Sequence, residues 1–127
     1  MEQFIGVKII KAVPGNAPED MGEYKKGTPG MIVEYGDGYR SWSPQHVFDE
    51  AYKRTSGMTF GLALEALKKG KAVRLPQWAA DVAIKAQFPD ENSKMTAPYL
   101  YVESRFGCVP WKETMIELFS EGWEIVE

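Results

Sequence analysis

The sequence contains one cysteine and one histidine, Cys108 and His46, and this scarcity excludes several kinds of site. A single cysteine cannot form a disulfide within the chain. The common metal-binding patterns CxxC, HExxH and the EF-hand loop are missing, as are the phosphate-binding GxxxxGK[ST] and dinucleotide-binding GxGxxG patterns. We therefore expect neither a metal nor a cofactor.

Long hydrophobic runs and an excess of positive charge are also absent. A membrane-spanning helix needs about 20 consecutive apolar residues, and the N-terminus lacks the charged and apolar regions of a signal peptide. We expect a cytoplasmic protein with no membrane partner. The net charge is -3 at pH 7, with basic residues scattered among acidic ones. A nucleic-acid polymer is disfavoured as partner because its binding usually requires a basic stripe, whereas a small phosphorylated ligand needs only a few local cations.

A polar stretch at residues 54–57 predicts a boundary between an N-terminal module, residues 1–54, and a second domain, residues 55–127. Within the module, Phe4–Lys11 is rich in β-branched residues and predicts a strand. Val13–Gly30 is rich in proline and glycine and predicts a loop with room for one helical turn. Met31–Tyr35 and Tyr39–Trp42 flank two glycines and predict a β-hairpin. The module should therefore be small and β-rich.

A helix should close this module. Ser43 is expected to cap it, with Pro44 at the first helical position. The helix should run to about Tyr52, and its apolar spacing predicts that one face is buried. The residues on that face are Val47, Phe48 and Ala51.

The second domain should contain two helices packed on an antiparallel sheet, which makes the whole chain α+β. The first helix is predicted between the N-cap Thr59 and the C-cap Gly70, with its apolar face formed by Phe60, Ala63, Leu64 and Leu67. The second should begin at a capping box, Thr114 to Glu117, and run to about Glu121. Strands are predicted at residues 72–75, 82–88, 99–103 and 123–126, with a polar loop at residues 90–96.

Catalytic groups are few. A lone histidine in a helix is most often a surface side chain, and Cys108 borders a short apolar strand that predicts a buried, inert thiol. Paired carboxylates among the 18 acidic residues keep hydrolase chemistry open.

The tryptophans are more informative. Trp123 begins a terminal strand and fits a core position, whereas Trp78 and Trp111 fall in turns flanked by polar residues. Arg74 lies at the end of the strand that leads to Trp78. Indoles can stack on a purine and a guanidinium can bind its phosphate, so these residues are candidates for a nucleotide site. Glu117 is compatible with a capping role, with a ribose contact, or with both.

Two segments carry a family resemblance. Residues 58–74 read MTFGLALEALKKGKAVR, with Trp78 four residues further on, and residues 109–127 read VPWKETMIELFSEGWEIVE. Both resemble the second type of bacteriophage Thoeris anti-defence protein. The N-terminal module, above all DGYRSWSPQHVFDEAYK, resembles a module that precedes this domain in many phage proteins.

The resemblance implies a non-enzymatic sponge. Such proteins bind cyclic ADP-ribose isomers made by TIR-domain enzymes, and some relatives hold the cyclic oligonucleotides of related systems such as CBASS. It further implies a homotetramer with pockets where subunits meet. Carried over by motif, Trp78 and Trp111 would stack adenine, Phe60 would line the pocket, Arg74 would face pyrophosphate and Glu117 would make a polar contact.

The chain departs from the family pattern beside the first of these tryptophans. Ala79 and Ala80 replace an Asn-Gly pair, which removes an amide donor.

Two other functions remain open. One is a phage adaptor or virion component that binds protein through an exposed Trp42 and a tyrosine-rich hairpin. The other is a phosphodiesterase or glycohydrolase acting on the same ligand.

Overall fold

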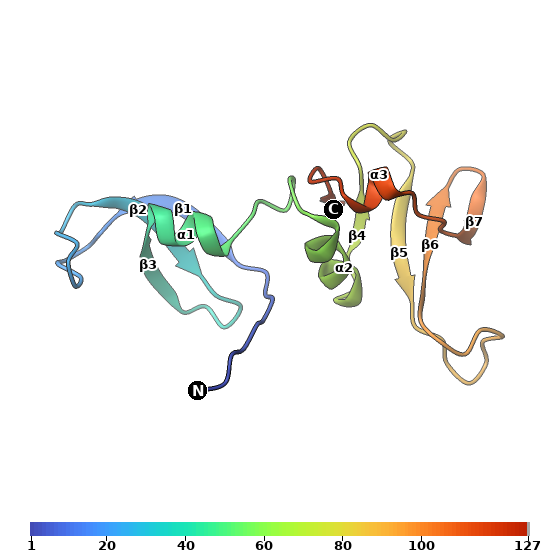
Figure 1. The fold of residues 1–127 in the computed structure, drawn as a ribbon, viewed down its shortest axis with the longest axis horizontal. Helices are drawn as coiled ribbons and strands as arrows, with labels where there is room; N and C mark the ends of the chain where they lie inside the picture. Colours follow the sequence, from blue (N-terminus) through green and yellow to red (C-terminus); the bar gives the residue numbers. More distant parts are fainter. Residues whose placement is uncertain (127) are drawn as a thin grey trace. The chain divides into compact units, whose positions relative to one another are not determined.

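The computed structural model describes residues 1–126 and divides the chain into two compact units, Met1–Lys53 and Arg54–Glu127. Glu127, at the end of the predicted second domain, lies outside the described residues. Both units combine strands with helices, so the α+β prediction is confirmed (Figure 1). Within residues 1–126, no helix combines the length and apolarity that crossing a membrane requires.

The first unit is a three-stranded antiparallel sheet with one helix. The sheet has the order β1-β2-β3, and α1 lies against β2 and β3. The predicted hairpin is confirmed: Tyr35 and Tyr39 are hydrogen-bonded across the turn, and Gly38 has a positive φ of 88°. The elements are β1 (Lys11–Asn16), β2 (Pro29–Glu34), β3 (Arg40–Pro44) and α1 (Gln45–Ala51).

Two expectations for the start of this unit are wrong. Residues 1–10 form no strand. The strand β2 pairs with residues 11–16 instead, and a segment without a partner strand forms none of the backbone hydrogen bonds that stabilise a sheet. Conversely, the predicted loop at Val13–Gly30 contains most of β1 and the start of β2. Pro14 is tolerated there because β1 is an edge strand, where proline's missing N–H costs least.

The helix α1 is present, but its predicted cap and buried face are wrong. The N-cap is Pro44, and the Ser43 hydroxyl donates to the Pro44 carbonyl (3.3 Å) instead of accepting from the helix. None of the α1 residues is buried, and Val47 is 44% exposed. The core of the unit is formed without them, by Ala17, Val33 and Trp42.

Trp42 is buried, at 7% exposure, and its indole Nε1 donates to the Gly15 carbonyl (2.9 Å). A close fit surrounds it, since a Cβ on Gly30 would come within 2.7 Å of the same Nε1. Trp42 therefore lacks the exposure that would support the protein-binding alternative.

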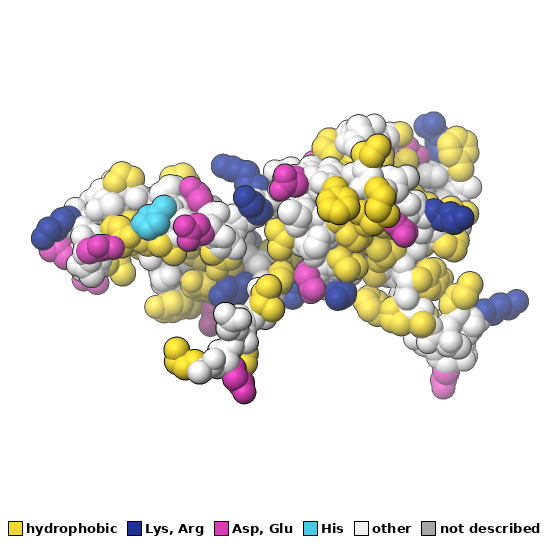
Figure 2. Space-filling view, viewed as in Figure 1, with side chains coloured by type: hydrophobic (Ala, Val, Ile, Leu, Met, Phe, Trp, Pro, Cys, Tyr) yellow, Lys and Arg dark blue, Asp and Glu magenta, His cyan; other side chains and the backbone are white. Residues whose placement is uncertain are grey.

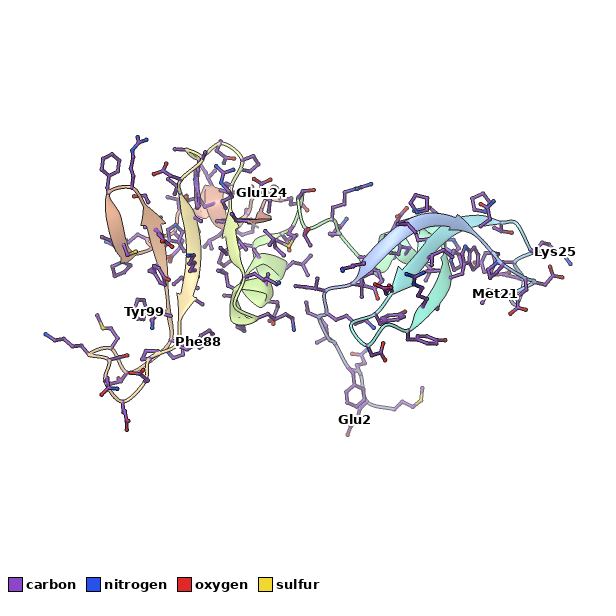
Figure 3. All side chains as sticks on the ribbon, turned by 180° about the vertical axis from the view of Figure 1, so that it is seen from behind. Glu2, Met21, Lys25, Phe88, Tyr99 and Glu124 are labelled. Atoms are coloured by element: carbon purple, nitrogen blue, oxygen red, sulfur yellow. The ribbon has the colours of Figure 1, made fainter. Side chains whose placement is uncertain are left out.

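The second unit packs two helices on an antiparallel sheet, as predicted, but the sheet has five strands rather than four, in the order β7-β6-β5-β4-β8. The loop between β5 and β6 separates Phe88 from Tyr99, which lie close to the ends of those strands (Figure 3). The elements are α2 (Phe60–Lys68), β4 (Ala72–Arg74), β5 (Ala83–Gln87), β6 (Tyr99–Ser104), β7 (Gly107–Pro110), α3 (Met115–Leu118) and β8 (Glu124–Val126).

Local signals define the helix α2. The Thr59 hydroxyl accepts from the Leu62 N–H (3.3 Å), which confirms the predicted N-cap. At the other end the C-cap is Lys69, one residue before the predicted Gly70. Gly70 has a φ of 88° and follows the cap in a Schellman arrangement that satisfies the last carbonyls. The apolar face packs on the sheet and forms the core with strand residues; the fully buried members are Ala63, Leu67, Val73, Leu75, Ile84 and Trp123.

Two expectations in this unit need correction. The helix α3 ends at Leu118 rather than near Glu121, because Phe119 already has the non-helical backbone of a C-cap. Cys108 is exposed rather than buried. It lies on β7, which was not predicted and which forms an edge of the sheet, so only one side of that strand is paired.

Candidate functional site

An aromatic cluster lies at the centre of the second unit. Trp123 is fully buried, and the rings of Phe60, Trp78 and Trp111 contact it with centroid distances of 5.3, 5.4 and 5.9 Å. The two outer indoles stand nearly perpendicular to Trp123, at 89° and 86°, in the edge-to-face geometry that aromatic pairs favour. The core prediction for Trp123 is confirmed, and this residue also supports the two half-buried tryptophans.

A pocket of about 280 Å³ opens beside this cluster. Its walls come from segments distant in the sequence: the turn between β4 and β5, the strand β6, the residue after β7, and α3. The lining residues are Trp78, Ala79, Val82, Val102, Trp111 and Glu117. Three of the five candidate site residues therefore meet in one pocket.

Glu117 has a structural role at the edge of this pocket. Its Oε1 accepts hydrogen bonds from the Thr114 N–H (2.9 Å) and hydroxyl (3.0 Å), while the Glu117 N–H donates to the Thr114 hydroxyl (3.2 Å). This is the predicted capping box. The indole Nε1 of Trp123 donates to the Glu117 carbonyl (2.9 Å), so the buried tryptophan also fixes the position of this acid.

Arg74 is not among the lining residues, because its guanidinium turns back into its own chain. Its Nη2 donates to the carbonyls of Trp78 (2.7 Å) and Ala79 (3.0 Å), and its Nε to that of Val82 (3.4 Å). Its Nη1 pairs with Glu124 (2.9 Å) on the neighbouring strand β8. Arg74 therefore holds the turn that supplies three of the six lining residues.

We expect Arg74→Lys to lower the free energy of unfolding by about 1–3 kcal/mol, because one ammonium cannot replace a planar fork that meets three carbonyls and a carboxylate. Chemical denaturation measures this. Arg40→Lys is the control: the Arg40–Glu34 pair is exposed (69% and 33%), so its change should stay within about 0.5 kcal/mol. Weakened ligand binding with unchanged stability would contradict this role and indicate direct contact of Arg74 with the ligand.

Phe60 also lies outside the pocket lining. Its ring packs against Trp111 (5.6 Å between centroids) and against Trp123, so it supports a wall instead of forming one. The residues that sequence reasoning missed are Ala79, Val82 and Val102. Small apolar residues carry no chemical signal of their own, and only the pairing of β5 with β6 brings the segments that contain Val82 and Val102 together.

Two titratable groups brace the strands behind the pocket. The Arg105 N–H donates to Asp81 Oδ2 (2.8 Å), which lowers the pKa of this carboxyl below its ordinary 3.8 and ties the β6–β7 turn to the residue before Val82. Across β5 and β6, a hydrogen bond and ion pair with Glu103 raise the pKa of Lys85. Both pairs link β5 and β6, or the residues next to them, whose antiparallel register places Val102 opposite Ile84.

The two scarce residues lie elsewhere. His46 is an exposed residue of α1, with the Tyr24 hydroxyl 3.3 Å from its Nε2. Cys108 is exposed on β7. Within residues 1–126, no three histidine, cysteine or acidic side chains are grouped so that they could hold a metal ion.

Comparison with known proteins identifies the unit that contains the pocket. The family model of the Thoeris anti-defense 2-like domain matches residues 58–126, more than half of the chain. No curated protein matches the sequence. The match begins after the first unit and covers every residue that lines the pocket. The chain therefore belongs to the Thoeris anti-defense 2-like family, and its second unit supports a role in overcoming Thoeris defence.

Proposed function

We propose that this protein sequesters cyclic nucleotide immune signals, cyclic ADP-ribose isomers in the first place, inside the infected bacterial host. The observation that carries the proposal is the convergence of Trp78, Trp111 and Glu117 on one pocket of an anti-defence domain. Indole rings provide surfaces for an adenine ring, and a carboxylate can accept hydrogen bonds from ribose hydroxyls or the adenine amino group.

The size of the pocket indicates how much ligand one chain encloses. Small-molecule sites usually measure about 300–1,000 Å³, and this pocket, at about 280 Å³, lies just below that range. It suits one base with part of its ribose. Two stacking contacts contribute roughly 2–6 kcal/mol, whereas nanomolar binding needs about 12 kcal/mol. Tight sequestration therefore requires further enclosure of the ligand.

A second copy of the chain would provide this enclosure, and we propose a homotetramer. The short helix α3, which contains Glu117, and its C-cap expose three large apolar side chains. Hydrophobic atoms gather over α3 in the space-filling view (Figure 2). The three are Met115 (64%), Ile116 (83%) and Phe119 (83%). Burial of such a patch between subunits would bring new groups to the mouth of the pocket.

The lining residues also support binding without turnover. Glu117 is their only titratable side chain. Hydrolysis by general acid–base catalysis usually employs two such groups, one to activate water and one to protonate the leaving group. The ligand should therefore be released unchanged.

The decisive experiment incubates the protein with cyclic ADP-ribose isomers and cyclic di- and trinucleotides, and measures depletion of each free ligand. The protein is then denatured and the released compound is identified by mass spectrometry. We expect at least one intact ligand, and light scattering of the complex should give four times the chain mass of 14.3 kDa. A modified product would make the protein an enzyme. No depletion, together with co-purification of a defined protein, would favour an adaptor.

A further inference from the structure

The charge of the pocket walls differs from what a phosphate group requires. Five of the six lining residues are apolar, and the sixth is an acid. Its carboxylate belongs to none of the ion pairs found within residues 1–126, which are Glu34–Arg40, Glu65–Lys68, Arg74–Glu124 and Glu103–Lys85. The pocket is therefore bordered by an acid whose Oε1 is held by Thr114 and whose charge no basic side chain of the described chain neutralises by an ion pair.

Arg74 does not supply the missing cation. Its charge is paired with Glu124, and its other contacts are the carbonyls of the turn that holds Trp78. The Arg74 side chain is also only 15% exposed. A phosphate inside the pocket would meet the Glu117 carboxylate with no basic residue among the walls, which like-charge repulsion disfavours.

The same walls are suited to a positive charge. Indole is the best of the aromatic rings for attracting a cation, and two indoles line this pocket. The attraction grows when water is excluded, and the other walls, Ala79, Val82 and Val102, offer only apolar side chains. Two tryptophans and a carboxylate that belongs to no ion pair provide the groups with which aromatic cages bind cationic ligands.

We propose that this pocket selects a purine that carries a positive charge on its ring, over a neutral purine, and leaves the phosphates of the ligand outside. The inference rests on the proposed function, because it names the part of a cyclic nucleotide that enters the pocket. A ring nitrogen that bears both an alkyl or ribosyl substituent and a positive charge has the required chemistry. Cyclic nucleotides whose purine is closed through such a nitrogen would be preferred.

Nucleoside probes test this preference without the cyclic ligand. The affinity of the full chain is measured by calorimetry for 1-methyladenosine, whose purine is positively charged at neutral pH, and for adenosine, whose purine is neutral. We expect 1-methyladenosine to bind roughly tenfold more tightly, which corresponds to a cation–π contact strengthened by the carboxylate. Adenosine 5′-monophosphate should bind no more tightly than adenosine.

Glu117→Gln isolates the charge, because glutamine preserves the capping box at this position. The preference for 1-methyladenosine should fall to roughly two- to fivefold, the part that the cation–π contacts with the indoles provide, and the adenosine affinity should stay nearly unchanged, since only the attraction to the carboxylate is lost. Glu113→Gln is the matched control: it removes the same charge from an exposed residue outside the pocket lining, and it should retain the full preference.

Equal affinities for the two nucleosides, an unchanged preference in Glu117→Gln, or no binding of either nucleoside at millimolar concentration would each overturn the inference. These outcomes are separate from the test of sequestration. Depletion of a cyclic nucleotide without a preference for 1-methyladenosine overturns only the charge selection. A preference for 1-methyladenosine without depletion of any cyclic nucleotide overturns only the proposed function.

Discussion

Trp123→Ala is expected to destabilise the second unit by about 3–5 kcal/mol, the usual cost of removing a large buried aromatic side chain. Trp123 is fully buried and contacts Phe60, Trp78 and Trp111. Because small domains have only about 5–15 kcal/mol of stability, this loss removes a large fraction of it and should lower the denaturation midpoint markedly. Chemical denaturation followed by circular dichroism measures the loss, and hydrogen exchange assigns it to residues 54–126.

The substitution Trp123→Phe separates packing from hydrogen bonding. Phenylalanine keeps an aromatic ring in the core but loses the Nε1 donor to the Glu117 carbonyl, so a loss of about 1–3 kcal/mol is expected. Phe106→Ala, at a ring that is 86% exposed, is the control and should change stability by no more than about 0.5 kcal/mol. An effect of Trp123→Ala as small as that of Phe106→Ala would show that the cluster does not depend on Trp123.

Local signals in the sequence predicted structure well because their partners lie within a few residues. The Thr59 cap, the Thr114–Glu117 capping box and the hairpin around Gly38 each follow from side chains or backbone angles close in the chain. Strand pairing is different. Phe4–Lys11 has the composition of a strand, but composition does not say which segment β2 selects as its partner, and β2 selects residues 11–16.

The burial of side chains was the second feature that the sequence could not predict. The spacing of Val47 in α1 is that of a buried face, yet the small unit is filled by Trp42 and Val33 and leaves this helix without a buried residue. Cys108 was expected inside the protein, but it lies on the edge strand β7. Both outcomes depend on how many layers and strands the fold has, which no local pattern encodes.

In the candidate site, too, local features could be predicted from the sequence and long-range contacts could not. The indoles Trp78 and Trp111 were singled out because turns expose them, and the structure brings both to one pocket with Glu117. Arg74 lies only four residues before Trp78, but the direction of its guanidinium depends on an ion pair with Glu124, 50 residues further along the chain. Because this ion pair is long-range, the sequence could predict that Arg74 lies at the end of a strand but not that its guanidinium turns away from the pocket.

Replacing both pocket tryptophans should have the largest effect on ligand binding. Each of Trp78→Ala and Trp111→Ala is expected to weaken binding of the cyclic nucleotide that the wild type depletes by about 5- to 150-fold, since stacking on one base contributes roughly 1–3 kcal/mol. The double variant should lose about 2–6 kcal/mol, which would weaken a nanomolar dissociation constant to between about 30 nanomolar and tens of micromolar. Equilibrium dialysis with each variant measures these affinities.

Stability must be separated from recognition in this series, because both indoles also pack on Trp123. Trp78→Phe and Trp111→Phe keep an aromatic face on the pocket and should retain most of the affinity, while circular dichroism verifies that the alanine variants remain folded. Trp42→Phe, in the other unit, controls for the loss of a buried indole far along the chain and should leave the affinity unchanged. If folded alanine variants bind as tightly as the wild type, the pocket beside Trp123 is not the ligand site, and the ligand must be held by groups outside the six lining residues.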